Sequence, residues 1–249
     1  VGYYYWPKET LDLLRSDQRV TCVKGNHEIN FITAISDEKE SQRLLKKYGS
    51  GYEVCKQFLN IDDVNWIDCL PNFKIIERGG ASFYLSHGDL KTLDTYIYPD
   101  AEPKILRKNL SDCTYTIFGH THYPLLYRHK NRTLINPGSV GQPRDVGGKA
   151  CYALVDQLTN EVQFHRVKFD IQKVVEAAMK YDPGLPYLQN VMKRKKIKNG
   201  ENIINFLVAG VAGDIGLGVG RILCEWFPQS KIFGIDLHDR HPGGLLFSG

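Results

Sequence analysis

The alternation of hydrophobic and polar positions predicts short helices mixed with strands over the first 170 residues. Leucines in residues 7–16 fall on one face of a helix that starts with a proline. Residues 36–49 have the pattern of a surface helix, which Ser36 would cap and Gly49 would end. Residues 61–71 predict another short helix, which ends at a proline.

Runs rich in β-branched and aromatic residues predict the strands. Two of these regions contain paired runs that predict hairpins, the first turning at Arg78-Gly79-Gly80. The predicted strands and hairpins lie at 19–25, 73–89, 114–118, 132–139 and 151–169. Together they indicate an α/β fold class, bordering on α+β, with a layered sheet core and flanking helices.

The pattern changes after residue 169 and predicts two further regions. Residues 170–200 predict helices broken by Pro and Gly, followed by a basic linker. We interpret the run at 193–196 as a solvated helix end rather than a contact for nucleic acid. Residues 204–239 predict a strand, a glycine-rich turn, a helix and a second strand. The expected domains are therefore 1–169, 170–200 and 201–249.

Composition narrows the class of protein without naming it. The 249 residues are 42% hydrophobic and 24% charged, and the formal net charge is +4, too small to point to nucleic acid or a membrane. The six cysteines form no CxxC pair, which favours free thiols and a cytoplasmic location. The first residues are neither an initiator Met nor a signal peptide, so we expect a chain cut at its start, and the ending after "HPGG" suggests a cut there too.

Three short polar motifs follow strand-like runs: "GNHE" (25–28), "SHGD" (86–89) and "GHTH" (119–122). We expect each histidine on a loop at one sheet edge, where sites form in layered folds. His120 and His122 would face one cavity if the stretch is extended. Imidazole is a common metal ligand, and an Asn oxygen is a plausible one beside it. His87 should then lie within about 12 Å of His120, since ligands lie about 2 Å from an ion.

These motifs, in this order, resemble the later motifs of the calcineurin-like metallophosphoesterases. The similarity continues through "INPGSVGQPRD" (135–145), covers about residues 1–190, and is greatest to small bacterial and archaeal phosphodiesterases. The family usually has Asp where this chain has Glu28. The resemblance implies hydrolysis of phosphomonoesters or phosphodiesters by a hydroxide that two divalent ions activate, with Mn, Fe, Zn or Ni all compatible.

The resemblance also implies roles for matching residues. Asn26, His87 and His120 would bind one metal, His122 would bind the other, and His27 would be the catalytic histidine that protonates the leaving oxygen. Arg144 is a candidate for substrate phosphate, although a Pro-Gly turn alone explains most of its neighbourhood.

The family begins with Asp-x-His and Gly-Asp motifs, which this sequence does not contain. Without the bridging carboxylate of the second motif, we expect this chain to be a poor catalyst.

The C-terminal stretch "GVAGDIGLGVG" resembles the start of Rossmann-type domains that precede ATP-grasp units, in which a nucleotide would meet Gly210, Gly213, Gly216 and Asp236. Two alternatives stay open: a nucleotide-binding, ATP-grasp-associated module, and a non-catalytic metal-binding interaction domain.

Overall fold

The computed structural model describes residues 1–194, 206–209, 232–235 and 246–247, and the chain divides into two units, Val1–Lys196 and Ile197–Gly249. In the second unit, β8 (Phe206–Ala209) pairs parallel with β9 (Ile232–Ile235), and β10 (Leu246–Phe247) pairs antiparallel with β9. The two strands predicted within 204–239 are therefore present. The helix predicted between them lies outside the described residues, as do Gly210, Gly213, Gly216 and Asp236.

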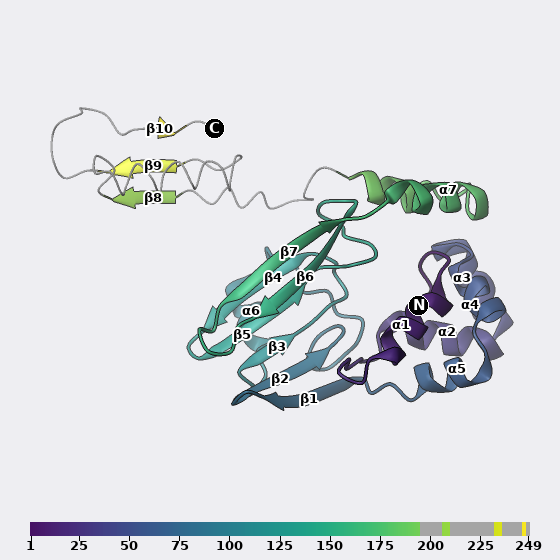
Figure 1. Ribbon diagram of the computed structural model, residues 1–249, viewed down its shortest axis with the longest axis horizontal. Helices are drawn as coiled ribbons and strands as arrows, with labels where there is room; N and C mark the ends of the chain where they lie inside the picture. The colour runs from purple at the N-terminus through teal and green to yellow at the C-terminus, as the bar shows by residue number, and fades with distance from the viewer. Residues whose placement is uncertain (195–205, 210–231, 236–245, 248–249) are drawn as a thin grey trace. The chain divides into compact units, whose positions relative to one another are not determined.

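The first unit is built on a five-stranded mixed sheet (Figure 1). Its order is β1-β2-β3-β5-β4, in which β2, β3 and β5 are parallel and the edge strands β1 and β4 are antiparallel to their neighbours. The strands are β1 (Phe73–Arg78), β2 (Ala81–Ser86), β3 (Tyr115–Ile117), β4 (Pro124–His129) and β5 (Arg132–Pro137). The predicted hairpin at 73–89 is confirmed, and its turn residues Gly79 and Gly80 both have positive φ.

Both faces of this sheet are covered. The hairpin β6 (Lys149–Val155) and β7 (Val162–Lys168) packs Ala153 and Phe164 against a buried cluster formed by Ala81, Phe83, Tyr115 and Ile135. A second cluster joins α6 (Pro103–Lys108) and the preceding loop to the sheet through Ile97, Leu106, Phe118, Leu125 and Leu134. The layers match the α/β class that the sequence predicts.

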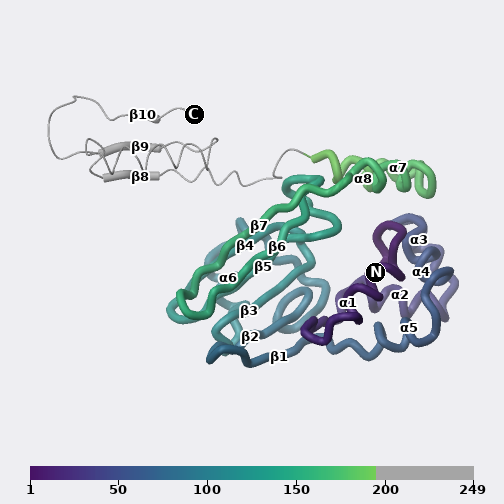
Figure 2. Tube along the Cα trace, in the orientation of Figure 1, coloured from purple at the N-terminus to yellow at the C-terminus, as the bar shows by residue number. Residues whose placement is uncertain are grey.

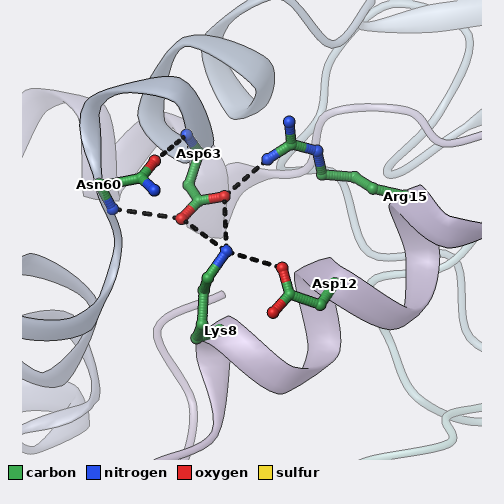
Figure 3. A network of polar contacts seen from close by, with 5 residues as sticks. All are labelled: Lys8, Asp12, Arg15, Asn60 and Asp63. Atoms are coloured by element: carbon green, nitrogen blue, oxygen red, sulfur yellow. Dashed lines mark hydrogen bonds and ion pairs between the residues drawn. The ribbon is translucent and has the colours of Figure 1, made fainter.

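A group of helices lies beside the sheet rather than on its faces (Figure 1). It contains α1 (Pro7–Ser16), α2 (Asn26–Ser36), α3 (Glu38–Tyr48), α4 (Gly51–Phe58) and α5 (Ile61–Asp68), around a core that includes Phe31 and Leu44. A polar network joins α1 to α5 (Figure 3), because the fully buried Asp63 carboxylate accepts from Lys8 at 3.3 Å and from Arg15 at 2.6 Å. Asp63 and Asn60 also cap α5 reciprocally.

The two ends of the first unit lie side by side (Figure 2). After β7 the chain forms α7 (Ile171–Tyr181), α8 (Tyr187–Asn190) and a 3₁₀ turn at Val191–Lys193. The Asp182 carboxylate follows α7 and accepts from Tyr5 Oη at 2.7 Å and from Ser50 N at 2.8 Å. It thereby fixes α7 to both the N-terminal segment and the start of α4.

Three local predictions are wrong. Residues 19–25 form no strand, because the segment finds no partner in a ladder, and Lys24 N donates instead to Pro71 O at 2.8 Å. Ser36 ends α2, and Asp37 caps α3 by accepting from Glu40 N at 3.1 Å. Asn26 and His27 lie in the first turn of α2 rather than on a loop. The structure adds elements that the sequence analysis does not predict: α2, α4, α6 and β4.

Candidate active site

The three polar motifs meet where β2 and β3 end. His87 follows β2 and His120 follows β3, and Gly119 N donates to His87 O at 2.9 Å, which joins the two loops. Asn26 reaches the same point from the first turn of α2, which begins there because the Glu28 carboxylate accepts from Gly25 N at 2.8 Å. The shared edge comes from the parallel arrangement of β2 and β3.

Three atoms with lone pairs converge at this point. His87 Nε2 lies 2.9 Å from Asn26 Oδ1 and 3.1 Å from His120 Nδ1. The predicted proximity of His87 and His120 is therefore confirmed. His87 Nε2 offers one outward direction, for either a proton or a lone pair, so it cannot make a well-directed hydrogen bond to both neighbours at once. Atoms bound about 2.1 Å from one cation at right angles lie about 3.0 Å apart, so the spacing fits a shared ion.

His120 and His122 do not lie on an extended stretch, which corrects the expectation from the sequence. Their φ angles are 62° and 63°, in the left-handed region that few residues other than glycine adopt. Surrounding bonds hold this conformation: His122 Nδ1 lies 2.8 Å from Gln142 O, and Asn136 Nδ2 donates to Thr121 Oγ1 at 3.0 Å. His120 Nε2 is buried, has no hydrogen-bond partner among the described residues, and lies 3.5 Å from Asp94 Oδ1.

Burial keeps these imidazoles neutral near pH 7. It lowers the pKa of His87 to about 4, and burial with the nearby Arg144 charge lowers the pKa of His122 to about 4. The pKa of His120 is also lowered, again chiefly by burial. A neutral imidazole has the free lone pair that a metal ligand requires.

His27 occupies a different environment, between aromatic rings. Its Nδ1 lies 2.7 Å from the hydroxyl of Tyr52, and its ring centroid lies 4.4 Å from that of Tyr3 and 4.9 Å from that of Tyr48. Burial lowers its pKa to about 3. Asn30 Nδ2 donates to Tyr52 Oη at 3.4 Å, so the Tyr52 hydroxyl is free to donate to His27 Nδ1. His27 would then carry its own proton on Nε2.

Arg144 adds a positive charge beside the histidines. Its main-chain N–H donates to His122 O at 3.3 Å, and its carbonyl accepts from Arg194 at 2.9 Å. Within residues 1–194, its guanidinium forms no hydrogen bond or ion pair. An unpaired guanidinium at this position suits an incoming phosphate.

The histidines also border a cavity of about 630 Å³. His27, His87 and His122 form part of its wall, and apolar residues such as Leu11, Trp66, Ile67, Phe169 and Val174 form much of the rest. Among the described residues, no cluster of three or more His, Cys, Asp or Glu side chains could hold a metal ion. The converging set therefore depends on the Asn26 oxygen as its third donor.

Sequence reasoning missed the tyrosines around this site. Their signal was present, because the chain has 14 Tyr and several occur in the tight runs "VGYYYWP" and "TYIYP". These side chains contact His27 or His120 only through the tertiary fold: Tyr3, Tyr48, Tyr52 and Tyr96.

The fold and the histidine motifs agree with the comparisons to known proteins. The sequence model of the calcineurin-like phosphoesterase superfamily domain matches residues 6–160. The chain therefore belongs to the calcineurin-like phosphoesterase superfamily, a family that implies metal-dependent hydrolysis of phosphate esters and divalent metal ions as cofactors. In the part of the chain that the structure describes, no helix is both long and apolar enough to cross a membrane.

Individual relatives support the same assignment. The chain is 32% identical over 200 residues to an uncharacterized protein of Methanocaldococcus jannaschii, covering 72% of this chain and 77% of that protein. A metallophosphoesterase from Sphaerobacter thermophilus is similar in structure, with a TM-score of 0.60, 26% identity, and coverage of 75% of this chain and 81% of that one. A hypothetical protein from Pyrococcus horikoshii shares the fold, with a TM-score of 0.67, 20% identity, and coverage of 80% and 83%.

Proposed function

We propose that this chain is a metal-dependent phosphoesterase that hydrolyses phosphodiesters or phosphomonoesters at the site formed by Asn26, His87 and His120. The observation that carries the proposal is the convergence of three donor atoms with separations of 2.9 and 3.1 Å. The donor set is neutral and mixes imidazole nitrogen with amide oxygen, which suits Mn, Fe, Zn or Ni. Bound divalent ions would supply an activated water and would neutralise charge on the phosphoryl oxygens.

The remaining residues have roles that follow from their surroundings. His122 is the candidate ligand for a second ion, because Gln142 O engages its Nδ1 and leaves Nε2 available. His27, whose Nε2–H is favoured by the Tyr52 contact at Nδ1, donates a hydrogen bond to the leaving oxygen of the ester and stabilises the negative charge that develops there, while its imidazole stays neutral. Arg144 binds phosphoryl oxygens through its unpaired guanidinium.

We also propose that turnover by these 249 residues is slow. Asn26, His87 and His120 supply three donors to one ion, but among the named candidates only His122 remains for the second. Among the described residues, the only carboxylate oxygen within ion-pair distance of these side chains is Asp94 Oδ1, 3.5 Å from His120 Nε2, and it does not reach His122. Two cations held close together without a shared negative ligand repel strongly.

The test combines metal binding with turnover. The chain, His87→Ala and the control His129→Ala are loaded with Mn²⁺, analysed for bound metal, and assayed with bis(4-nitrophenyl) phosphate. His129 ends β4 opposite Arg132, the first residue of β5, and therefore lies at the other edge of the sheet from the ends of β2 and β3. We expect slow, Mn²⁺-dependent hydrolysis and near-stoichiometric metal in the chain and in His129→Ala, with both lost in His87→Ala.

Two outcomes would refute parts of this proposal. Metal content that does not depend on His87 would refute the assignment of the ion site. Metal that depends on His87, without turnover of any phosphate ester tried, would instead favour the non-catalytic metal-binding domain.

A further inference from the structure

Two exposed tyrosines stand beside the metal site on the loop between β2 and α6. The Tyr96 ring lies against the His120 imidazole, with centroids 3.9 Å apart, and the Tyr98 ring lies 5.8 Å from Tyr96 with an interplanar angle of only 13°. Between them, Ile97 is 3% exposed and belongs to the core cluster under the sheet. The buried Ile97 side chain therefore fixes the loop to the core, while Tyr96 and Tyr98 on either side of it stay at the surface.

Packing alone does not account for this pair. Tyr96 and Tyr98 remain 46% and 41% exposed. The start of the loop is held by its own hydrogen bonds, since Asp89 Oδ1 accepts from Lys91 N at 2.7 Å and from Thr92 N at 2.6 Å. The two rings thus leave a substantial aromatic surface open to solvent on an anchored segment.

The positive charge of Arg144 links this surface to the phosphate-binding part of the site. Arg144 N donates to His122 O at 3.3 Å, and the Tyr96 ring lies against His120, so Arg144 and Tyr96 both contact the stretch from His120 to His122. A ligand whose phosphate sits at the histidines and Arg144 would therefore bring its neighbouring group to the Tyr96–Tyr98 pair.

We propose that Tyr96 and Tyr98 form a stacking platform for a planar aromatic group carried by the phosphate ester, of which a nucleobase is the best match. This inference rests on the proposed function, because the phosphate-binding residues are those of the candidate active site. Every nucleobase has a π-face, so stacking on tyrosine recognises nucleobases in general without selecting one base over another. The platform separates nucleotide-like or aryl esters from alkyl esters.

The experiment uses the whole chain in a fixed concentration of Mn²⁺ and measures binding by calorimetry. The probes are adenosine 5′-monophosphate, phenyl phosphate and ribose 5-phosphate. We expect adenosine 5′-monophosphate to bind at least about fivefold more tightly than ribose 5-phosphate. Tyr98→Ala should bring that ratio close to one without changing the affinity for ribose 5-phosphate, whereas Tyr98→Phe keeps the ring and should keep the ratio.

Tyr152→Ala is the matched control, because Tyr152 is 39% exposed and stacks on His165 in the β6–β7 hairpin. Phenyl phosphate should also bind more tightly than ribose 5-phosphate, and phenyl phosphate that binds no better than ribose 5-phosphate would overturn the extension of the platform to aryl esters. The proposal is overturned if the wild-type chain does not bind adenosine 5′-monophosphate, binds it no better than ribose 5-phosphate, or keeps its preference in Tyr98→Ala. Failure of hydrolysis with an intact, Tyr98-dependent preference would count against the proposed function alone.

Discussion

Replacing Tyr52 with phenylalanine removes one oxygen atom and tests how His27 is positioned. Tyr52 is 1% exposed, and its hydroxyl lies 2.7 Å from His27 Nδ1. Burial raises the pKa of Tyr52 far above its ordinary value, so the hydroxyl stays protonated and acts as a donor. Tyr52→Phe should leave His27 free to carry its proton on either ring nitrogen, because nothing else bonds Nδ1 among the described residues.

The expected loss of stability in Tyr52→Phe follows from the His27 Nδ1 atom, which loses its hydrogen-bond partner. The phenyl ring of Tyr52→Phe fills the same space, so no cavity opens. A buried His27 Nδ1 without a partner costs about 1–3 kcal/mol, and we expect a loss of about 1.5 kcal/mol in the free energy of unfolding. Because one positioned hydrogen-bond donor to developing charge contributes about 10²–10³-fold to kcat, partial loss of the correct tautomer should lower kcat by about tenfold.

Two measurements separate this role from a merely structural one. Nitrogen-15 NMR of the His27 ring reports the tautomer directly, and it does not depend on activity. Tyr115→Phe is the matched control, since Tyr115 is also 1% exposed and its hydroxyl donates to Asn160 at 2.8 Å, away from the histidines. We expect similar destabilisation in both variants but a change of tautomer and of kcat only in Tyr52→Phe. The reasoning fails if the His27 tautomer is the same in Tyr52→Phe and the wild-type chain.

Three further predictions concern stability and substrate binding. At pH 7, Asp63→Asn should lower the free energy of unfolding by about 2 kcal/mol, measured by tryptophan fluorescence during urea unfolding. Burial would raise the pKa of Asp63, but the Asn60 N–H and the nearby cations hold it below its usual value. The stabilisation by the ionised Asp63 carboxylate is therefore fully present above the unfolded pKa of about 3.9 and is lost as the pH falls through the lower folded pKa. A stability difference between the wild-type chain and Asp63→Asn that persists below the folded pKa would contradict this. Gly49→Ala should cost about 1–2 kcal/mol more than Gly80→Ala in urea unfolding. Both glycines have positive φ, but only at Gly49 would the new Cβ lie 2.6 Å from Asp182 Oδ2, and equal losses would show that the contact relaxes freely. Arg144→Ala should raise KM for bis(4-nitrophenyl) phosphate about tenfold with a smaller change in kcat, and an unchanged KM would remove Arg144 from phosphate binding.

Much of the fold was readable from local sequence. The helix at 7–16, the helix that begins at Ile61 and the hairpin that turns at Gly79 and Gly80 match their predictions, because leucine spacing, an initial proline and paired glycines act over a few residues. The wrong strand at 19–25 shows the limit of this reasoning. A strand requires a partner in a ladder, and no local pattern reveals whether one is available.

For the candidate site too, the sequence identified the residues and the tertiary structure arranged them. The motifs "GNHE", "SHGD" and "GHTH" named Asn26, His87 and His120, because their residue types suit metal ions wherever the chain folds. Their convergence required β2 and β3 to lie parallel, with α2 starting opposite them. The left-handed conformation of His120 was likewise imposed by hydrogen bonds from distant segments.

The sequence by itself therefore determined the family, the order of most elements and the identity of the histidines. Only the tertiary structure brought the Tyr52 hydroxyl to 2.7 Å from His27 Nδ1, since Tyr52 lies on a helix 25 residues further along the chain. It also placed Tyr96 against His120 and left Tyr98 exposed beside it. These contacts join residues far apart in sequence, and their energies depend on burial and orientation, which are properties of the packed chain rather than of any short segment.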